Sequence, residues 1–202
     1  PLFNTATSKL LTEKKCQQAN DVYIALQHIN NNFCNAPSTG STFKSFLLLE
    51  DDFEFCKGSS MHMMQILKTL PQNFRGIRIS YGLNGILLNC QILPDLLSYL
   101  DYIALARPSG AIVPIDWLIE NFLHQVEDLQ AYTEYKLTHG KYSLHDDKDI
   151  SSSQFYIYKY NLMEHRGTMT SSVGNTHSGS LYPKCYEAQT NNQCRFMYDM
   201  EN

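Results

Sequence analysis

The sequence predicts an α/β fold, because short apolar segments typical of strands alternate along the chain with longer segments of helical periodicity. Residues 42–49 form a strand candidate that ends in acidic residues, and residues 59–70 follow with a helical pattern. Residues 76–81 alternate in the manner of a second strand, and another helical segment begins at Leu93. We therefore expect a mixed sheet flanked by helices.

Length and composition set the scale of this fold. With 202 residues, of which 43% are hydrophobic, the chain can bury one sizeable core. We expect one compact domain over residues 1–180 and a polar C-terminal extension over residues 181–202. The net charge is −4 and Lys and Arg never form a run, so nucleic acid is not an expected partner. No segment has the apolar length of a membrane span.

The first expected element is a helix over residues 5–30. Its apolar positions are Leu10, Leu11, Val22, Ile24, Leu26 and Ile29. Residues 30–41 are rich in Asn, Ser and Gly and indicate a loop before the strand. In the next helix, Ser59 or Ser60 is the expected cap and Pro71 the expected stop. We interpret the methionines of this helix as core residues; they are Met61, Met63 and Met64.

Further along, residues 82–85 indicate a turn between the strand at 76–81 and an apolar run at residues 86–88. The helix that begins at Leu93 gives way to an exposed turn at residues 108–110. A last helix is expected from Asp116 onward, after a short apolar segment.

Three consecutive carboxylates, Glu50-Asp51-Asp52, stand where the first strand ends. Adjacent like charges repel, so their place directly after an apolar strand indicates a bound cation that offsets the repulsion. Oxygen ligands of this kind suit Mg²⁺ or Mn²⁺, which commonly hold a substrate phosphate. This pattern points to an enzyme acting on a nucleotide or nucleotide-sugar. The alternative interpretation is a charged turn between two strands.

The six cysteines show no Cys-x-x-Cys pair and no spacing typical of zinc ligands. Cys185 and Cys194 flank a polar loop and could close a small disulfide in an oxidising compartment. Six free thiols are the alternative. The region around residues 145–149 is acidic, but it lacks the Gly and terminal Glu of a calcium-binding loop, and we interpret it as a solvated loop.

Three ordered blocks resemble the N-acetylglucosaminyltransferase IV family, glycosyltransferase family 54. The acidic triplet is similar to the metal-binding signature of inverting transferases of the GT-A fold. The segment Pro114-Ile115-Asp116-Trp117-Leu118 resembles a Pro-Ile-Asp-Trp-Leu segment of that family. A third block covers residues 160–172 and is similar to a histidine-containing stretch followed by two serines. The resemblance spans about residues 10 to 180 and implies a GT-A-like domain.

The resemblance also implies roles for the triplet and its surroundings. Asp52 would bind the divalent metal, Mn²⁺ or Mg²⁺, that bridges the donor diphosphate. Glu50 and Asp51 would face the ribose or the transferred sugar. Asn84 would lie in a glycine-containing loop near the donor or acceptor, although a simple hairpin turn is an equal alternative.

Two further positions follow from the third block. His165 matches a family histidine that would contact the diphosphate or complete the metal shell, the alternative being a structural histidine. Arg166 would pair with phosphate, or would be a solvated charge.

Asp116 has two compatible interpretations. As the cap of a helix, its carboxylate would accept hydrogen bonds from free backbone N–H groups. By resemblance, it would be the catalytic base that deprotonates the acceptor hydroxyl as that oxygen attacks the anomeric carbon, inverting its configuration. The Asp-Trp pair favours Asp116 over Glu120 for this role.

Several departures from the family pattern bear on the expected function. Arg78 stands where the family has an acid, and Met169 where it has a second histidine. The chain begins just ahead of the helix that precedes the triplet, so we expect the N-terminal part of the GT-A domain to be missing. An anchor or targeting signal would have been lost with that part, and membrane association is expected only through such an anchor.

The expected activity is transfer of N-acetylglucosamine from a UDP-sugar donor to a glycan or glycoprotein acceptor, in the manner of N-glycan enzymes of the Golgi lumen and secretory pathway. One alternative is a related GT-A transferase with another sugar or acceptor. Another is a non-catalytic homologue that acts as an interaction module.

Overall fold

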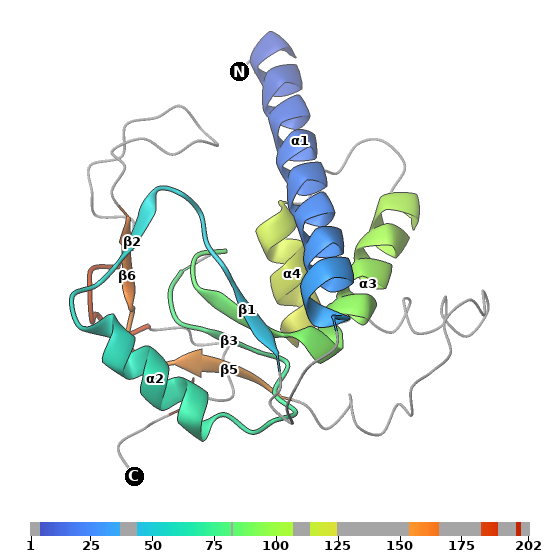
Figure 1. Cartoon of the computed structure of the whole chain (residues 1–202). Helices are drawn as coiled ribbons and strands as arrows, with labels where there is room; N and C mark the ends of the chain where they lie inside the picture. The colour runs from blue at the N-terminus through green and yellow to red at the C-terminus, as the bar shows by residue number, and fades with distance from the viewer. Residues whose placement is uncertain are drawn as a thin grey trace. The chain divides into compact units, whose positions relative to one another are not determined.

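The computed structural model describes residues 5–36, 44–81, 83–106, 114–124, 154–165, 183–189 and 197–198 (Figure 1). The chain forms two compact units. The helical unit comprises Pro1–Thr42, Gln91–Asp146 and Ser171–Val173, and the sheet unit comprises Phe43–Cys90, Asp147–Thr170 and Gly174–Asn202. The mixture of helices with a mixed sheet agrees with the predicted class. None of the described helices is sufficiently long and apolar for a membrane crossing.

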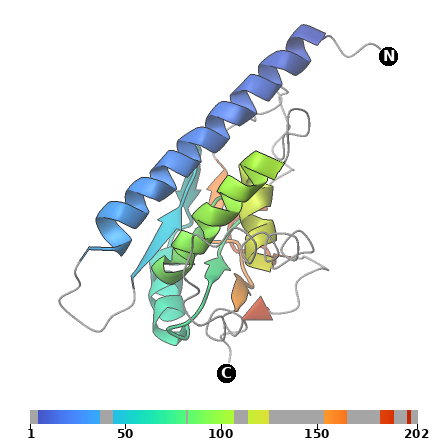
Figure 2. The ribbon, with the colours of Figure 1, turned by 90° about the vertical axis from the view of Figure 1, so that its right-hand side faces the viewer.

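The helical unit packs three α-helices together. Helix α1 is Thr5–Ile29, α3 is Leu93–Ala106 and α4 is Ile115–His124, and each contacts the other two. Figure 2 shows α1 and α3 running alongside each other. Leu26 of α1, Leu96 of α3 and Ile119 of α4 are buried, and the rings of Tyr99 and Phe122 lie 5.5 Å apart between centroids. The Tyr23 hydroxyl donates to Asp101 at 2.6 Å and ties α1 to α3 at their exposed side.

The sheet unit contains a five-stranded mixed sheet in the order β1-β4-β3-β5-β7. Its strands are β1 Ser45–Leu48, β3 Gly76–Arg78, β4 Ile86–Asn89, β5 Phe155–Tyr158 and β7 Met197–Tyr198. The pairs β1–β4 and β3–β4 are antiparallel, whereas β3–β5 and β5–β7 are parallel. A separate antiparallel ribbon pairs β2 Phe53–Phe55 with β6 Met163–His165.

Helix α2, Ser59–Thr69, packs on the five-stranded sheet and closes the core of this unit. Ile66 of α2 and the following Leu70 and Phe74 are buried against strand residues Ile77 and Tyr158. Some of these apolar side chains lie on one face of the helix and others on the strands that it covers. Burial of their apolar surface supplies most of the free energy that stabilises this packing.

Most predicted helices and strands are present, with shifted ends. The first helix continues past Ile29 into a π-helical turn, Asn30–Cys34, where a loop was expected, and a 3₁₀ turn, Cys90–Ile92, precedes α3. The predicted serine cap of α2 is wrong: Gly58, in a left-handed conformation, precedes the helix, and Ser59 is its first residue. Pro71 follows the end of α2 as predicted.

The assignment of all three methionines to the core is also wrong. Met63 is partly buried against the core, but Met61 is 77% exposed and Met64 is 58% exposed. The reason is the orientation of α2: its inward side carries Met63 and Ile66, so Met61 and Met64 fall on its outer side.

The cysteine pairing differs from the one predicted. Cys185 is bonded to Cys56, which lies 129 positions away at the end of β2, and not to Cys194. Cys34 and Cys90 are also disulfide-bonded, which excludes six free thiols, while Cys16 is an exposed free thiol. The sequence suggested a bond that closes the nearby polar loop. Instead, Cys56 donates to Leu162 and Tyr186 to Asn161, and these backbone bonds bring Cys56 and Cys185 together.

Gly85 is the point where three segments of the sheet unit meet. Its N–H donates to Leu48 at the end of β1, at 2.9 Å, and its carbonyl accepts from the N–H of Ile79, at 2.8 Å. Ile79 in turn accepts a bond from Leu162, just before β6. Gly85 has φ +79°, and an added Cβ would lie 2.6 Å from Cγ1 of Ile79. Glycine is therefore required here both by conformation and by close approach.

We expect Gly85→Ala to lower the free energy of unfolding by about 3 kcal/mol, the sum of a positive φ and an overpacked contact. The matched control is Gly58→Ala, which has φ +87° but meets its nearest atom only at 3.5 Å. Only the conformational cost remains there, about 1 kcal/mol. Urea unfolding of both variants measures the difference, and equal losses would show that the contact at Gly85 is unimportant.

Candidate functional site

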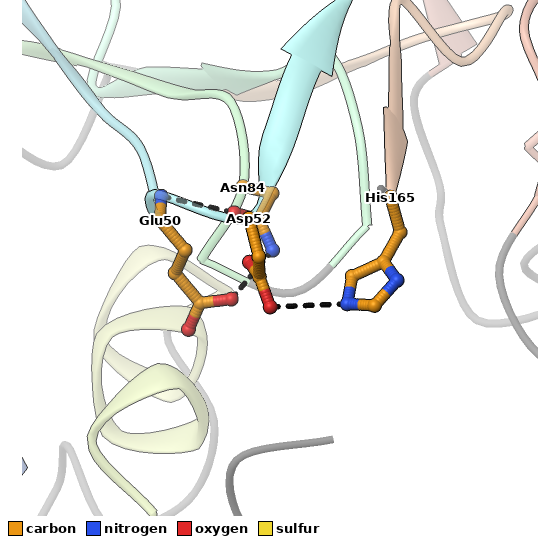
Figure 3. Close-up of polar contacts among 4 residues, drawn as sticks. All are labelled: Glu50, Asp52, Asn84 and His165. Carbon is orange, nitrogen blue, oxygen red and sulfur yellow. Dashed lines mark hydrogen bonds and ion pairs between the residues drawn. The ribbon is translucent and has the colours of Figure 1, made fainter. Parts of the chain in front are cut away.

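The acidic triplet lies in the sheet unit, in the turn that joins β1 to β2. Glu50 follows the last strand residues, and Asp51 and Asp52 form the turn itself. Asp51 is exposed, while Glu50 and Asp52 are half-buried. Figure 3 shows the carboxyl groups of Glu50 and Asp52 and the ring of His165 on the same side of this turn.

Glu50 is held by the side chain of Asn84, from the turn between β3 and β4. The backbone N–H of Glu50 donates to Oδ1 of Asn84 at 3.0 Å. Nδ2 of Asn84 donates to Oε2 of Glu50 at 2.8 Å (Figure 3). Asn84 is only 3% exposed, whereas Glu50 is half-buried. The hairpin turn is therefore present as predicted, and it also reaches the triplet.

Asp52 contacts His165, the last residue of β6. Nε2 of His165 lies 3.0 Å from Oδ2 of Asp52, and the side chain of His165 is 6% exposed against 34% for Asp52 (Figure 3). Pairing of β2 with β6 sets His165 opposite Phe53, and the two rings meet edge to face with centroids 4.9 Å apart. The contact is a hydrogen bond from Nε2 to the carboxylate in the tautomer that carries the ring proton on Nε2.

The second oxygen of Asp52 is buried and has no hydrogen-bond partner within the described part of the chain. Burying an unsatisfied carboxylate oxygen is costly, and a cation coordinated there would offset the cost. A carboxylate oxygen is a ligand that suits Mg²⁺ or Mn²⁺. Across the described ranges no group of three His, Cys, Asp or Glu residues is arranged as a metal cage. Mg²⁺ and Mn²⁺ sites that share their ion with a phosphate need only one or two protein carboxylates.

A buried network that the sequence did not reveal connects β6 to the rest of the unit. The hydroxyl of Ser80 donates to Oδ1 of Asn161 at 2.7 Å, and both residues are fully buried. The Asn161 amide also donates to the carbonyls of Met163 and Pro183. A lone Asn between two strands carries no sequence signal for this role, because its partners lie up to 81 positions away.

The segment around Cys185 is fixed to the same network. The hydroxyl of Tyr186 donates to the carbonyl of Lys57 at 2.6 Å, and backbone bonds join Tyr186 and Glu187 to Asn161. Together with the Cys56–Cys185 disulfide, these contacts attach residues 183–189 to the ends of β2 and β5.

Asp116 lies in the helical unit, in the first turn of α4. The helix begins at Ile115, so Asp116 stands inside the helix and is not its cap. Burial raises the pKa of Asp116 above its usual value, and the negative charge of Glu120 adds to this. The N–H groups of Trp117 and of Asp116 itself, with the charge of Lys15, act in the opposite direction but do not prevail. A carboxylate of this kind is a better proton acceptor than an ordinary surface aspartate.

The predicted residues thus divide between the two units. The sheet unit brings Glu50, Asp51, Asp52, Asn84 and His165 together, and the helical unit carries Asp116. Arg166 lies outside the described residues, as do Met169 and the acidic loop at residues 145–149. Arg78 lies in β3 and is buried.

Comparison of the chain with protein-family models, with curated proteins and with solved structures found no match.

The raised pKa of Asp116 makes a prediction about stability. In the folded chain Asp116 binds its proton more tightly than in the unfolded chain, so its contribution to stability is complete below the unfolded pKa. That contribution is lost as the pH rises from there through the folded pKa. We expect Asp116→Asn, which cannot ionise, to gain stability relative to the wild type as the pH rises above the unperturbed pKa of 3.8.

Urea unfolding at several pH values measures this difference. Asp21→Asn is the matched control, because Asp21 is exposed on α1. A gap between wild type and Asp116→Asn that stays constant with pH would contradict the raised pKa.

Proposed function

We propose that the chain is part of an inverting, metal-dependent glycosyltransferase that moves N-acetylglucosamine from a UDP-sugar to a glycan of a glycoprotein. The observation that carries the proposal is the state of Asp52. Asp52 is the last residue of the acidic triplet that follows β1. Its Oδ2 lies against His165, and its Oδ1 is buried with no hydrogen-bond partner among the described residues. Such a carboxylate fits a divalent cation shared with a diphosphate.

Each candidate site residue of the sheet unit would have its own role. Asp52 would hold Mn²⁺ or Mg²⁺ through Oδ1, while His165 fixes the carboxylate through Oδ2. Partners behind a metal ligand commonly orient it in this way. When bound, the metal would stabilise the negative charge that builds on the departing diphosphate. Glu50 and Asp51 would accept hydrogen bonds from hydroxyl groups of the donor, and Arg166 would pair with its phosphates.

Asp116 would be the base. Its carboxylate would take the proton of the acceptor hydroxyl as the oxygen forms a bond to the anomeric carbon of the donor. The bond from that carbon to the diphosphate breaks on the opposite side, and its electron pair leaves with UDP. The raised pKa of Asp116 supports this role, since a base works best when its pKa approaches the working pH.

The cysteine chemistry supports a place in the secretory pathway, as the Golgi lumen would provide. Disulfides persist in oxidising compartments and are rare in the cytosol. Cys34, Cys56, Cys90 and Cys185 are all disulfide-bonded.

The metal assignment predicts that UDP binds in the presence of Mn²⁺ and much more weakly without it. Asp52→Ala should lower the metal-dependent affinity by at least about tenfold, because it removes the ligand itself. Titration calorimetry measures both affinities. Asp21→Ala is the control for loss of one negative charge on the protein. Wild-type protein that binds no UDP, or an Asp52→Ala variant that binds as well, would contradict the proposal and favour a non-catalytic interaction module.

If Asp116 is the base, its substitution should slow sugar transfer without weakening binding of the donor. Asp116→Asn should slow transfer from UDP-N-acetylglucosamine to N-glycan acceptors by about 10²- to 10⁴-fold while leaving UDP affinity unchanged. Release of UDP over time measures the rate. Glu120→Gln is the matched control, since Glu120 lies one turn further along α4. An equal loss in both variants would show that the effect comes from the helix and not from the base.

A further inference from the structure

Asn84 is bonded to Glu50 through both polar atoms of its amide. Oδ1 accepts the backbone N–H of Glu50 at 3.0 Å, and Nδ2 donates to the Glu50 carboxylate at 2.8 Å (Figure 3). With 3% of its surface exposed, Asn84 faces Glu50 and the interior. A ligand that reaches this site would meet Glu50 and not the amide behind it.

The chemistry of the two groups fixes their orientation. A backbone N–H can only donate and an ionised carboxylate can only accept, so the amide oxygen must face the first and the amide nitrogen the second. Among short side chains, a carboxamide supplies both functions from one planar group. An Asp at this position would keep the shape but would place an acceptor against an acceptor.

Asn84 is itself rigidly held, which makes it an effective support. Its N–H donates to the carbonyl of Tyr81, closing the turn. The next residue, Gly85, bonds to Leu48 and Ile79 and has no room for a side chain. Glu50, by contrast, has a long side chain with several rotatable bonds, and fixing it in advance lowers the entropy cost of any later contact.

We propose that Asn84 is a positioning residue, which contacts no ligand and holds the Glu50 carboxylate ready to accept hydrogen bonds from hydroxyl groups of the donor. This inference rests on the proposed function. The resemblance placed Asn84 in a loop near the donor or acceptor, whereas here Asn84 acts only through Glu50. It also makes recognition of a donor hydroxyl depend on the hairpin turn between β3 and β4.

A double-mutant cycle tests the proposal. Binding of UDP-N-acetylglucosamine with Mn²⁺ is measured for wild type, Glu50→Ala, Asn84→Ala and the double variant. We expect each single change to weaken binding about tenfold, and the double variant to bind no worse than Glu50→Ala. Losses that multiply to about a hundredfold would show that Asn84 acts independently of Glu50. An unchanged affinity in either single variant would also overturn the proposal.

Two further variants separate positioning from a merely structural role. Asn84→Asp keeps the shape of the side chain, so it should restore binding if the residue only fills space. We expect no restoration, because two carboxylates would then face each other at the position of the 2.8 Å bond. Asn89→Ala removes another fully buried Asn of the same hairpin, which bonds to the carbonyl of Gln72, and should leave affinity unchanged.

Amide hydrogen exchange provides a readout that needs no ligand. The Glu50 amide should be protected in wild type and in Asn89→Ala, and should exchange at least about tenfold faster in Asn84→Ala. If the wild type binds no UDP, the proposed function fails while this measurement still decides whether Asn84 fixes Glu50. If UDP binds but the Glu50 amide exchanges equally fast in all variants, the positioning role fails and the proposed function stands.

Discussion

The close backbone contact at Gly85 is the constraint on which the acidic site depends. Through one residue, the turn between β3 and β4 is bonded to the end of β1 and, by way of Ile79, to the segment before β6. These segments carry Asn84, the acidic triplet and His165, respectively. A side chain at Gly85 would collide with Ile79. Only glycine at this position therefore allows the three segments to approach one another this closely.

The side-chain amides of two buried Asn residues add hydrogen bonds to these backbone contacts. Asn84 satisfies the donor and acceptor groups of Glu50, and Asn161 joins Ser80 to the carbonyls of Met163 and Pro183. Asn84 is 3% exposed and Asn161 is fully buried, so their hydrogen bonds help to specify one arrangement of the unit. Among the described residues, Oδ1 of Asp52 is a buried carboxylate oxygen without a hydrogen-bond partner, and a cation would suit it.

The carboxylates of the two units have different chemical surroundings. In the sheet unit, the side chains of Asn84 and His165 contact Glu50 and Asp52 and hold these two carboxylates in place as candidate ligands. In the helical unit, burial and the neighbouring Glu120 raise the pKa of Asp116 and favour uptake of a proton. A transferase of the proposed kind needs both properties, anionic ligands for the metal and donor on one hand and a proton acceptor on the other.

The sequence by itself determined the elements that local patterns specify. Helical periodicity located α1, α2 and α3, Pro71 marked the end of α2, and the apolar run before Glu50-Asp51-Asp52 located β1 and the acidic turn. Only the tertiary structure decided which side of α2 faces the core, so Met61 and Met64 proved exposed. It alone paired Cys56 with Cys185, Asn84 with Glu50, and His165 with Asp52. Local propensity acts over a few residues, whereas these pairs are 34 to 129 positions apart and meet because strand pairing and core burial bring them together.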